Sequence, residues 1–264
     1  MNSKIERLDS ILAGHAPLVV AYSGGVDSAC LLAEAHRVLG ARVLGVIADS
    51  PSLPRAALAE ALALAAEIGA NVEVVKTAEF DNADYTANRP NRCYFCKAEL
   101  FTRLDELAKT RGFSAIAYGE NADDARQVRP GRTAAEQFAV IAPLRDAALT
   151  KAEIRERSRE LGLPTADAPA QPCLSSRIPW GTPVTVAALG MIERGEAAVR
   201  ALGFRIFRVR HVVEGTVVKA RVQIAPEEME GVDGVREAIE SELREVGYAA
   251  VEIDPAGYRS PIAS

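Results

Sequence analysis

The sequence predicts an α/β protein, in which a parallel sheet is followed by a smaller α+β domain. Two observations support this prediction. Up to residue 119, short apolar runs alternate with helical patterns, an order that gives parallel strands with helices on both faces of the sheet. Beyond residue 185, the order changes to helix, two alternating strands, helix and strand, which is typical of a small α+β domain.

In the first region, the predicted strands are buried apolar runs at 17–22, 41–48, 71–76 and 114–119. The predicted helices carry apolar residues at helical spacing and lie at 1–17, 29–40, 53–70, 96–112 and 150–164. The last of these begins with Thr150 and Glu153 at the spacing of a capping box, which fixes where the helix starts.

Residues 164–185, PTADAPAQPCLSSRIPWGTPVT, contain five prolines and little periodicity. A long irregular segment inside a compact protein is usually a linker or a functional loop. We therefore divide the chain into a nucleotide-binding domain (1–165), a cysteine-containing functional loop or linker (166–184) and a small C-terminal α+β domain (185–264). The elements predicted in the last part are helices at 185–203 and 231–247 and strands at 204–212, 216–224 and 249–253.

Composition restricts the class of protein and its compartment. No apolar run approaches the roughly 18 residues that a membrane span needs, and the charged N-terminus lacks the apolar core of a secretion signal. We therefore expect a cytoplasmic protein with no membrane partner, whose cysteines are metal ligands or reactive thiols rather than disulfides. The net charge of −5 argues against a broad nucleic-acid-binding face.

The stretch SGGVDS (23–28) joins the first predicted strand to a helix. Two glycines allow the backbone to turn tightly and to aim its N–H groups at an anion. Asp27 is placed to hold a metal ion that phosphates carry. The loop has no lysine of the kind found in G-x-x-x-x-G-K-[ST], so it differs from the common phosphate-binding loop.

SGGVDS resembles the PP-loop of the ATP pyrophosphatases, and this resemblance implies the adenine nucleotide alpha hydrolase-like fold for the parallel-sheet domain. This resemblance implies an enzyme that uses ATP and Mg²⁺, splits ATP between its α and β phosphates and transfers AMP to an oxygen. In GENADD (119–124), Asp123 and Asp124 either touch metal or nucleotide or belong to a polar loop that caps a helix. Asp49, after the second strand, is expected near the adenosine. The residues expected to bind the nucleotide are Ser23, Gly24, Gly25, Val26, Asp27, Ser28, Asp49 and Asp124.

The four cysteines fall into two groups. Cys30 lies among Ala and Leu in a predicted helix, and we interpret it as a small buried hydrophobe. Cys93 and Cys96 form a C-x-x-C pair, and Cys173 supplies a third thiol from the proline-rich loop. The pair alone is compatible with a redox dithiol or with part of a metal site, including a zinc site completed by Cys30 or His211.

The PP-loop together with PCLSSRIPWGTPV and the later FRVRH is similar to ATP-dependent sulfur transferases of the LarE type, over nearly the whole chain. That resemblance implies adenylation of the carboxylates of pyridinium-3,5-biscarboxylic acid mononucleotide and their conversion to thiocarboxylates. The product belongs to the biosynthesis of the nickel-pincer cofactor of lactate racemase. In one branch of the family, a cysteine matching Cys173 donates its own sulfur and becomes dehydroalanine. In the other, three cysteines hold a 4Fe–4S cluster that carries the sulfur, and Cys93, Cys96 and Cys173 match them.

Arg208 and Arg210 alternate on a predicted strand and therefore share a face, whereas His211 lies on the other face. Paired arginines suit a phosphate, and the resemblance implies that these two, with Ser176 and Arg177, hold the substrate phosphate. It gives only weak support for metal binding by Glu196 and Glu227. The resemblance also implies a homo-oligomer, an external sulfur donor and other nickel-pincer pathway enzymes as partners.

Other functions remain compatible with these motifs. A tRNA-thiolating PP-loop enzyme also combines adenylation with cysteines, but it needs an RNA-binding face that the acidic balance disfavours. An amide-forming ligase of the NAD synthetase kind has no need of three cysteines. A nucleotide or metal sensor without enzymatic activity would use the same loop.

Overall fold

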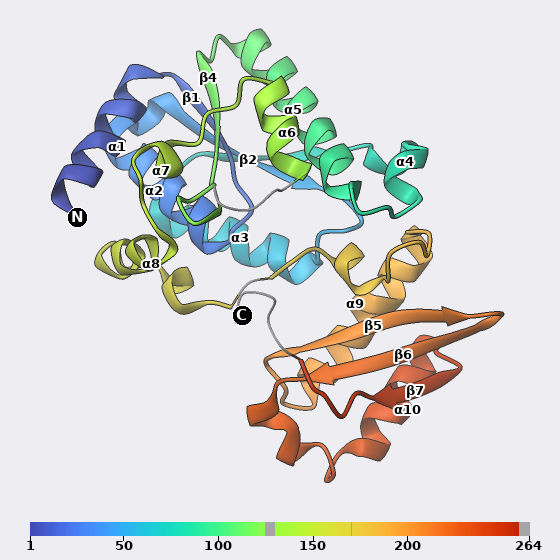
Figure 1. The fold of residues 1–264 in the computed structure, drawn as a ribbon. Helices are drawn as coiled ribbons and strands as arrows, with labels where there is room; N and C mark the ends of the chain where they lie inside the picture. The colour runs from blue at the N-terminus through green and yellow to red at the C-terminus, as the bar shows by residue number, and fades with distance from the viewer. Residues whose placement is uncertain (125–129, 170, 259–264) are drawn as a thin grey trace. The chain divides into compact units, whose positions relative to one another are not determined.

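The computed structural model describes residues 1–124, 130–169 and 171–258. The chain divides into two compact units, and each is described by itself (Figure 1). The first unit contains residues 1–82 and 91–168, and the second contains residues 83–90 and everything from 169 onward. The short segment 83–90 thus leaves the first unit and joins the second, an excursion that the sequence pattern does not indicate.

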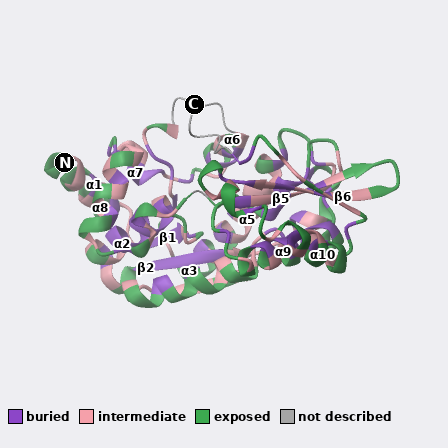
Figure 2. Ribbon diagram, turned by 90° about the horizontal axis from the view of Figure 1, so that it is seen from below, coloured by how far each residue is buried: buried purple, intermediate pink, exposed green. Residues whose placement is uncertain are grey.

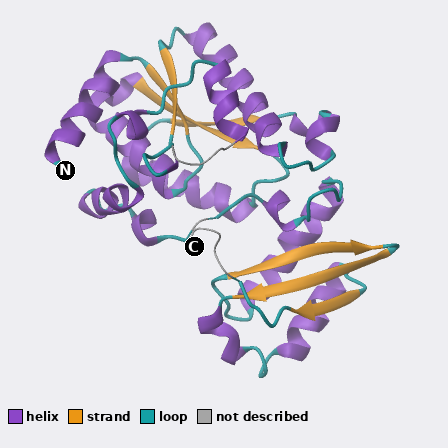
Figure 3. Cartoon of the chain, viewed as in Figure 1, coloured by secondary structure: helices purple, strands orange, loops and turns teal. Residues whose placement is uncertain are grey.

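A four-stranded parallel sheet forms the centre of the first unit (Figure 3). The strand order is β3-β2-β1-β4, and each strand matches one of the predicted apolar runs, with β2 ending at Asp49, just beyond its run. The strands are β1 (Leu18–Ala21), β2 (Val43–Asp49), β3 (Val72–Lys76) and β4 (Ala115–Tyr118). Because the chain order reverses at β1, the carboxyl ends of β1 and β4 border the crevice where such sheets bind ligands.

Alternation along the strands gives the sheet two apolar faces. Figure 2 shows β2 as a mostly buried strand. Leu18 and Val20 of β1 belong to one cluster, and Val19 belongs to the other. The first cluster includes residues of α1 (Asn2–Gly14), α2 (Val26–Leu39), α3 (Arg55–Ile68), α7 (Pro143–Asp146) and α8 (Lys151–Glu160). The second includes residues of α5 (Arg92–Arg111) and α6 (Pro130–Gln137). The predicted parallel sheet covered on both faces is therefore confirmed.

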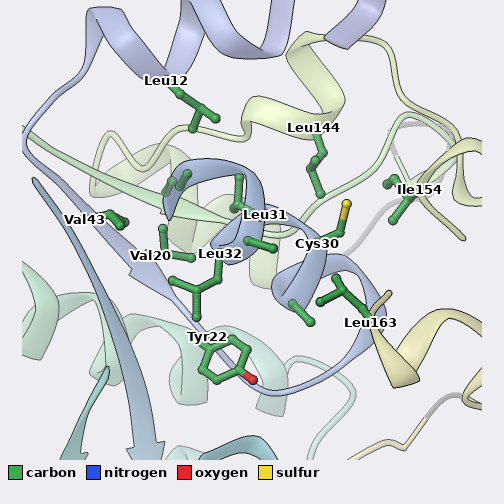
Figure 4. Close-up of a cluster of buried hydrophobic side chains, with 14 of the residues drawn as sticks. Leu12, Val20, Tyr22, Cys30, Leu31, Leu32, Val43, Leu144, Ile154 and Leu163 are labelled. Carbon is green, nitrogen blue, oxygen red and sulfur yellow. The ribbon is translucent and has the colours of Figure 1, made fainter. Parts of the chain in front are cut away.

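Cys30 lies inside this first cluster, as Figure 4 shows. Its side chain is fully buried on α2, and burial raises the pKa of the thiol to about 12, with the charge of Glu34 adding to the effect. A thiol with such a pKa stays protonated near neutral pH and is a poor metal ligand or nucleophile. The prediction that Cys30 is a buried hydrophobe is confirmed.

Two predicted helix starts were wrong. α10 begins at Arg236 instead of Gly231. α5 begins at Arg92 instead of Cys96, so both cysteines of the C-x-x-C pair lie near its N-terminus. The helix start predicted from the capping box is confirmed, because Thr150 and Glu153 form both of its hydrogen bonds at α8. In the described ranges, no helix combines the length and the apolar character that crossing a bilayer requires.

The second unit contains the predicted α-β-β-α-β arrangement. Its sheet has the order β5-β6-β7, in which β5 and β6 are antiparallel and β6 and β7 are parallel. The elements are α9 (Val186–Ala201), β5 (Phe207–Glu214), β6 (Val217–Ile224), α10 (Arg236–Val246) and β7 (Ala250–Ile253). Val209 and Val222 pack with residues of α9 and α10 on one face of this sheet. Arg208 and Arg210 alternate with these buried residues and lie on the other face.

Candidate active site

The PP-loop lies between β1 and α2, at the crevice of the parallel sheet. Gly25 is the N-cap of α2, and the first helical hydrogen bond runs from the amide of Ala29 to the carbonyl oxygen of Gly25. Within the described part of the chain, the amides from Gly24 to Ser28 make no hydrogen bond. Unpaired amides at a helix N-terminus, together with the positive end of the helix dipole, form an anion site.

Two glycines allow this loop to pack closely. Gly24 has a φ of +74°, and a Cβ atom there would lie 2.7 Å from the Cβ of Ala61 on α3. Gly119, which follows β4, lies against the start of α2, where a Cβ atom would come within 2.8 Å of the amide nitrogen of Ser28. Both positions therefore require glycine, Gly24 for conformation and space and Gly119 for space alone.

We expect Gly119→Ala to damage the loop without touching a ligand. The added methyl group meets rigid backbone at Asp27 and Ser28, so we expect a loss of about 1–3 kcal/mol in unfolding free energy and weaker ATP binding. Chemical denaturation and ATP titration measure the two effects. Gly14→Ala is the matched control, because a Cβ atom there meets nothing within 4 Å. Equal behaviour of the two variants would contradict the close packing.

Asp27 is the acidic residue of the loop, and its two carboxylate oxygens have different surroundings. Oδ2 accepts a hydrogen bond from Nζ of Lys151 at 2.7 Å. Oδ1 is buried and has no hydrogen-bond partner among the described residues. A buried carboxylate oxygen without a partner, beside an anion site, fits a Mg²⁺ ion that ATP phosphates bring with them.

The acidic pair of GENADD is already engaged in local structure. Oδ2 of Asp123 accepts a hydrogen bond from the amide of Lys151 at 2.8 Å, and so caps α8. Asp124 donates its amide to the side chain of Asn121 and accepts a hydrogen bond from it. These contacts correspond to the polar loop with a helix cap. Asp49 forms an ion pair with Arg55 at the end of β2. Nucleotide contacts by Asp49 and Asp124 stay predictions.

A buried ionic network, which no sequence motif indicates, supports the loop after β4. Glu120 is buried and accepts hydrogen bonds from the hydroxyl of Tyr118 and from the guanidinium groups of Arg132 and Arg145. Burial opposes ionisation of Glu120, but the bonds from Tyr118 and Arg132 outweigh it and lower the pKa of its carboxyl group. Arg132 also donates to the carbonyl oxygen of Asp124, which ties α6 to the loop.

Cys93 and Cys96 lie three residues apart near the N-terminus of α5. Residues at this spacing lie on the same side of a helix, so both sulfur atoms can reach one metal centre. Cys93 is exposed and Cys96 is partly buried, and both are reduced thiols. Within the described ranges, no group of three or more His, Cys, Asp and Glu side chains is arranged to hold a metal ion. The two cysteines belong to the first unit, whereas Cys173 belongs to the second.

Cys173 is an exposed thiol on a loop that Arg177 holds in place. Arg177 is buried, and it donates two hydrogen bonds, from Nε and Nη2, to the carboxylate of Glu196 on α9, at 2.8 and 2.9 Å. Its Nη1 donates to the carbonyl oxygens of Pro172 and Cys173 and to the hydroxyl of Ser176. The guanidinium group is thus committed to shaping this loop, and a phosphate contact by Arg177 stays a prediction.

Segment 83–90 of the second unit also holds the loop. Asn88 is fully buried and donates to the carbonyl oxygens of Pro179 and Thr182, both at 2.8 Å. The hydroxyl groups of Tyr85 and Ser175 lie 3.0 Å apart. Residues 171–184 are therefore held by two buried side chains, Arg177 from within the loop and Asn88 from segment 83–90. This distinguishes them from a simple linker.

The sheet of the second unit places two arginines beside this loop. Nη1 of Arg210 donates to the carbonyl oxygen of Ser176 at 2.6 Å. Arg208 stacks on the ring of Tyr258, with 4.6 Å from the guanidinium carbon to the ring centroid. Burial and then the charge of Arg177 lower the pKa of both side chains. Three guanidinium groups face two carboxylates, those of Glu196 and Asp254, which leaves a surplus of positive charge that suits an anion.

His211 and Glu227 lie away from this arrangement. His211 is buried on the opposite face of β5, against Tyr248, and burial lowers its pKa. Its predicted position on the other face is confirmed. Glu227 is exposed in a short helix after β6. Glu196, which lies within the arrangement as the partner of Arg177, also accepts a hydrogen bond at Oε1 from the amide of Val209 on β5. Metal binding by Glu196 or Glu227 stays a prediction.

No protein-family model matches the chain. Pyridinium-3,5-bisthiocarboxylic acid mononucleotide synthase of Lactiplantibacillus plantarum, a LarE protein, is 30% identical to it, over 92% of this chain and 87% of the relative. The chain belongs to the LarE-like family of PP-loop ATP pyrophosphatases. Uncharacterized protein slr1717 of Synechocystis is 40% identical, over 98% of this chain and 96% of its own length.

A more distant relative of this LarE-like protein supports the assignment of the first unit. Argininosuccinate synthase of Methanocaldococcus jannaschii is 30% identical over 55% of this chain and 40% of its own length. The LarE-like protein is therefore an ATP-dependent enzyme of the PP-loop type, with the adenine nucleotide alpha hydrolase-like fold that the sequence predicts.

Proposed function

We propose that this LarE-like protein is an ATP-dependent sulfur transferase. It adenylates the carboxylates of pyridinium-3,5-biscarboxylic acid mononucleotide and converts them to thiocarboxylates for the nickel-pincer cofactor of lactate racemase. The observation that carries the proposal is the similarity to the L. plantarum synthase over most of both chains. The product in that relative's name has two thiocarboxylates and one nucleotide phosphate. The PP-loop of the first unit suits activation of a carboxylate by ATP, and the arginines of the second unit suit a phosphate.

The first step is adenylation at the PP-loop. A carboxylate oxygen of the substrate attacks the α-phosphorus of ATP, and the bond from that phosphorus to the bridging oxygen breaks, with its electron pair leaving on pyrophosphate. The loop amides from Gly24 to Ser28 bind phosphate oxygens, and Asp27 would hold the Mg²⁺ that neutralises phosphate charge. The resulting acyl-adenylate has AMP as a good leaving group, which the free carboxylate lacks.

The second step replaces AMP with sulfur. We propose that Cys93, Cys96 and Cys173 hold a 4Fe–4S cluster, since cysteine thiolates are the usual ligands of such clusters. When bound, a cluster with three protein ligands supplies a sulfide for transfer from its fourth iron. The cysteines bring the right donor atoms, two from one helical turn and one from a loop that Arg177 and Asn88 hold in place.

A sacrificial route is the alternative. The thiolate of Cys173 would attack the acyl carbon and AMP would leave, which gives a thioester. Loss of the Cα proton of Cys173 would then break its Cβ–S bond, leaving the thiocarboxylate and dehydroalanine. This route uses up Cys173 in one turnover and gives no role to Cys93 and Cys96, so we favour the cluster.

Substrate-dependent pyrophosphate release tests the proposed function. Wild-type protein with Mg²⁺ and ATP should release pyrophosphate when the pyridinium biscarboxylate is added. It should not respond to ammonia with deamido-NAD, the substrates of an amide ligase, or to tRNA. Release that depends on tRNA would indicate a tRNA-thiolating enzyme instead. Tight ATP binding with no release under any condition would indicate a sensor.

Arg210→Ala should separate substrate binding from ATP binding. Loss of one charge-assisted contact to the substrate phosphate is expected to weaken substrate binding about 10- to 100-fold, while ATP binding changes less than about 3-fold. Isothermal titration with each ligand measures both. Arg244→Ala on α10 is the control, because Arg244 is exposed and pairs only weakly with Glu240. Equal weakening of both ligands by Arg210→Ala would argue against a phosphate site on β5.

A further inference from the structure

Lys151 forms an ion pair with the acidic residue of the PP-loop across a large sequence separation. It is the first residue of α8, and its Nζ lies 2.7 Å from Oδ2 of Asp27. The side chains of Lys151 and Asp27 are 34% and 21% exposed, so the ion pair is accessible to solvent beside the loop and does not lie in the core. An exposed pair of this kind adds little to stability, and its position beside the anion site is its distinctive feature.

The start of α8 is fixed beside the loop by several independent contacts. The amide of Ala122 donates to the carbonyl oxygen of Leu149, and the amide of Lys151 donates to Asp123. The capping box of Thr150 and Glu153 sets the first turn. One turn further, Ile154 is fully buried in the cluster that contains α2. The ammonium group of Lys151 is therefore held near the loop by a rigid helix.

The PP-loop itself provides amides and one carboxylate but no cation. In the common phosphate-binding loop, a lysine inside the loop reaches the β and γ phosphates. Here, the residues from Ser23 to Ser28 include no basic side chain, and the ammonium group of Lys151 contacts the loop from α8. We propose that Lys151 supplies this missing cation from α8 and binds the β and γ phosphates of ATP, the part that leaves as pyrophosphate.

The two carboxylate oxygens of Asp27 explain how Lys151 would have a partner both without ligand and with Mg²⁺ and ATP bound. Without ligand, Oδ2 neutralises the ammonium group, and Oδ1 has no partner among the described residues. When Mg²⁺ and phosphates enter, the carboxylate of Asp27 turns to the metal and Lys151 turns to phosphate oxygens. As the bond from the α-phosphorus to the bridging oxygen breaks, charge develops on the leaving pyrophosphate, and a fixed ammonium group stabilises it. No proton moves in this step.

Binding of ATP fragments tests the role of Lys151. In the presence of Mg²⁺, Lys151→Gln should weaken pyrophosphate and ATP binding about 10- to 100-fold, the range for one charge-assisted contact. AMP, which lacks the β and γ phosphates, should lose less than about 3-fold in affinity. Lys151→Arg keeps the charge and should restore part of the loss. Lys4→Gln is the matched control, since Lys4 pairs with Glu153 of the same helix at 2.7 Å and is 33% exposed.

Acetylation of lysines in the wild-type protein tests the same proposal without a variant. Lys151 and Lys4 are equally exposed, so a lysine acetylating reagent should label both, and mass spectrometry can follow each site. Pyrophosphate with Mg²⁺ should slow labelling of Lys151 several-fold and leave Lys4 unchanged, whereas AMP should protect neither. This measurement holds even if Lys151→Gln fails to fold.

The inference rests on the proposed use of ATP, and the outcomes keep the two apart. If wild-type protein binds neither ATP nor pyrophosphate, the proposed function itself fails. If wild-type protein binds both and Lys151→Gln binds pyrophosphate equally well, the inference about Lys151 alone is wrong. Equal losses for pyrophosphate and AMP, or equal losses in Lys4→Gln, would also overturn it, because they would indicate general damage to the loop.

Discussion

Asp27→Ala is expected to abolish pyrophosphate release from ATP. The substitution removes the unpartnered Oδ1 atom that is placed for Mg²⁺ and leaves Lys151 without its counter-ion. We expect the rate to fall by at least about 100-fold, equivalent to about 2.7 kcal/mol of transition-state stabilisation. A coupled assay for pyrophosphate, with ATP and the pyridinium substrate saturating, measures the loss.

The control for this prediction is Asp105→Ala. Asp105 also pairs with a lysine, Lys109, but on the exposed side of α5. That variant should retain wild-type activity, and both variants should unfold near the wild-type temperature. If Asp27→Ala still releases pyrophosphate at a comparable rate, the assignment of the phosphate loop is wrong.

Cys173→Ala is expected to separate the two halves of the reaction. Adenylation takes place at the PP-loop, so substrate-dependent pyrophosphate formation should persist at a rate within about 3-fold of wild type, a change of about 0.7 kcal/mol or less in activation free energy. Thiocarboxylate formation should fall below detection, because Cys173 is required by both the cluster route and the sacrificial route. Normal thiocarboxylate yield from this variant would remove Cys173 from the mechanism.

Iron content distinguishes the two routes. Protein purified without oxygen should carry about four irons and about four acid-labile sulfides per chain if a 4Fe–4S cluster is present. Replacing Cys93, Cys96 or Cys173 with alanine should remove them, whereas Cys30→Ala should not, because Cys30 is buried in α2. Absence of iron, together with loss of sulfur from Cys173 after one turnover, would favour the sacrificial route. A single zinc ion would contradict both.

Local patterns in the sequence predicted most of the fold. All four strands of the first unit were predicted from apolar runs, because parallel strands buried on both faces must be apolar throughout. The start of α5 was missed because the residues before Cys96 include Asn88, Pro90 and Asn91 and show no helical period. Segment 83–90 could not be assigned to the second unit, because its contacts depend on Asn88 and Tyr85, polar groups whose partners lie about 90 residues away.

Those parts of the candidate site that consist of neighbouring residues in one motif could be predicted from the sequence. The PP-loop and the alternating Arg208 and Arg210 could be recognised from adjacent residues. Lys151 was not recognised, since it meets Asp27 only after the chain has completed β4 and begun α8. The ion pair between Arg177 and Glu196 was missed for the same reason. Pairs of charged residues that are far apart in the sequence have no periodic signature. The motifs could therefore be recognised in the sequence, whereas their charged partners could be identified only in the structure.

Mass analysis of the pyridinium product tests the central claim most directly. Wild-type protein, prepared without oxygen, would be incubated with Mg²⁺, ATP, a sulfide source and pyridinium-3,5-biscarboxylic acid mononucleotide, and the nucleotide recovered. The proposed function predicts products in which one and then two carboxylate oxygens are replaced by sulfur, with AMP and pyrophosphate formed for each replacement. Recovery of unchanged substrate, from protein that hydrolyses ATP or binds it tightly, would contradict the proposed function.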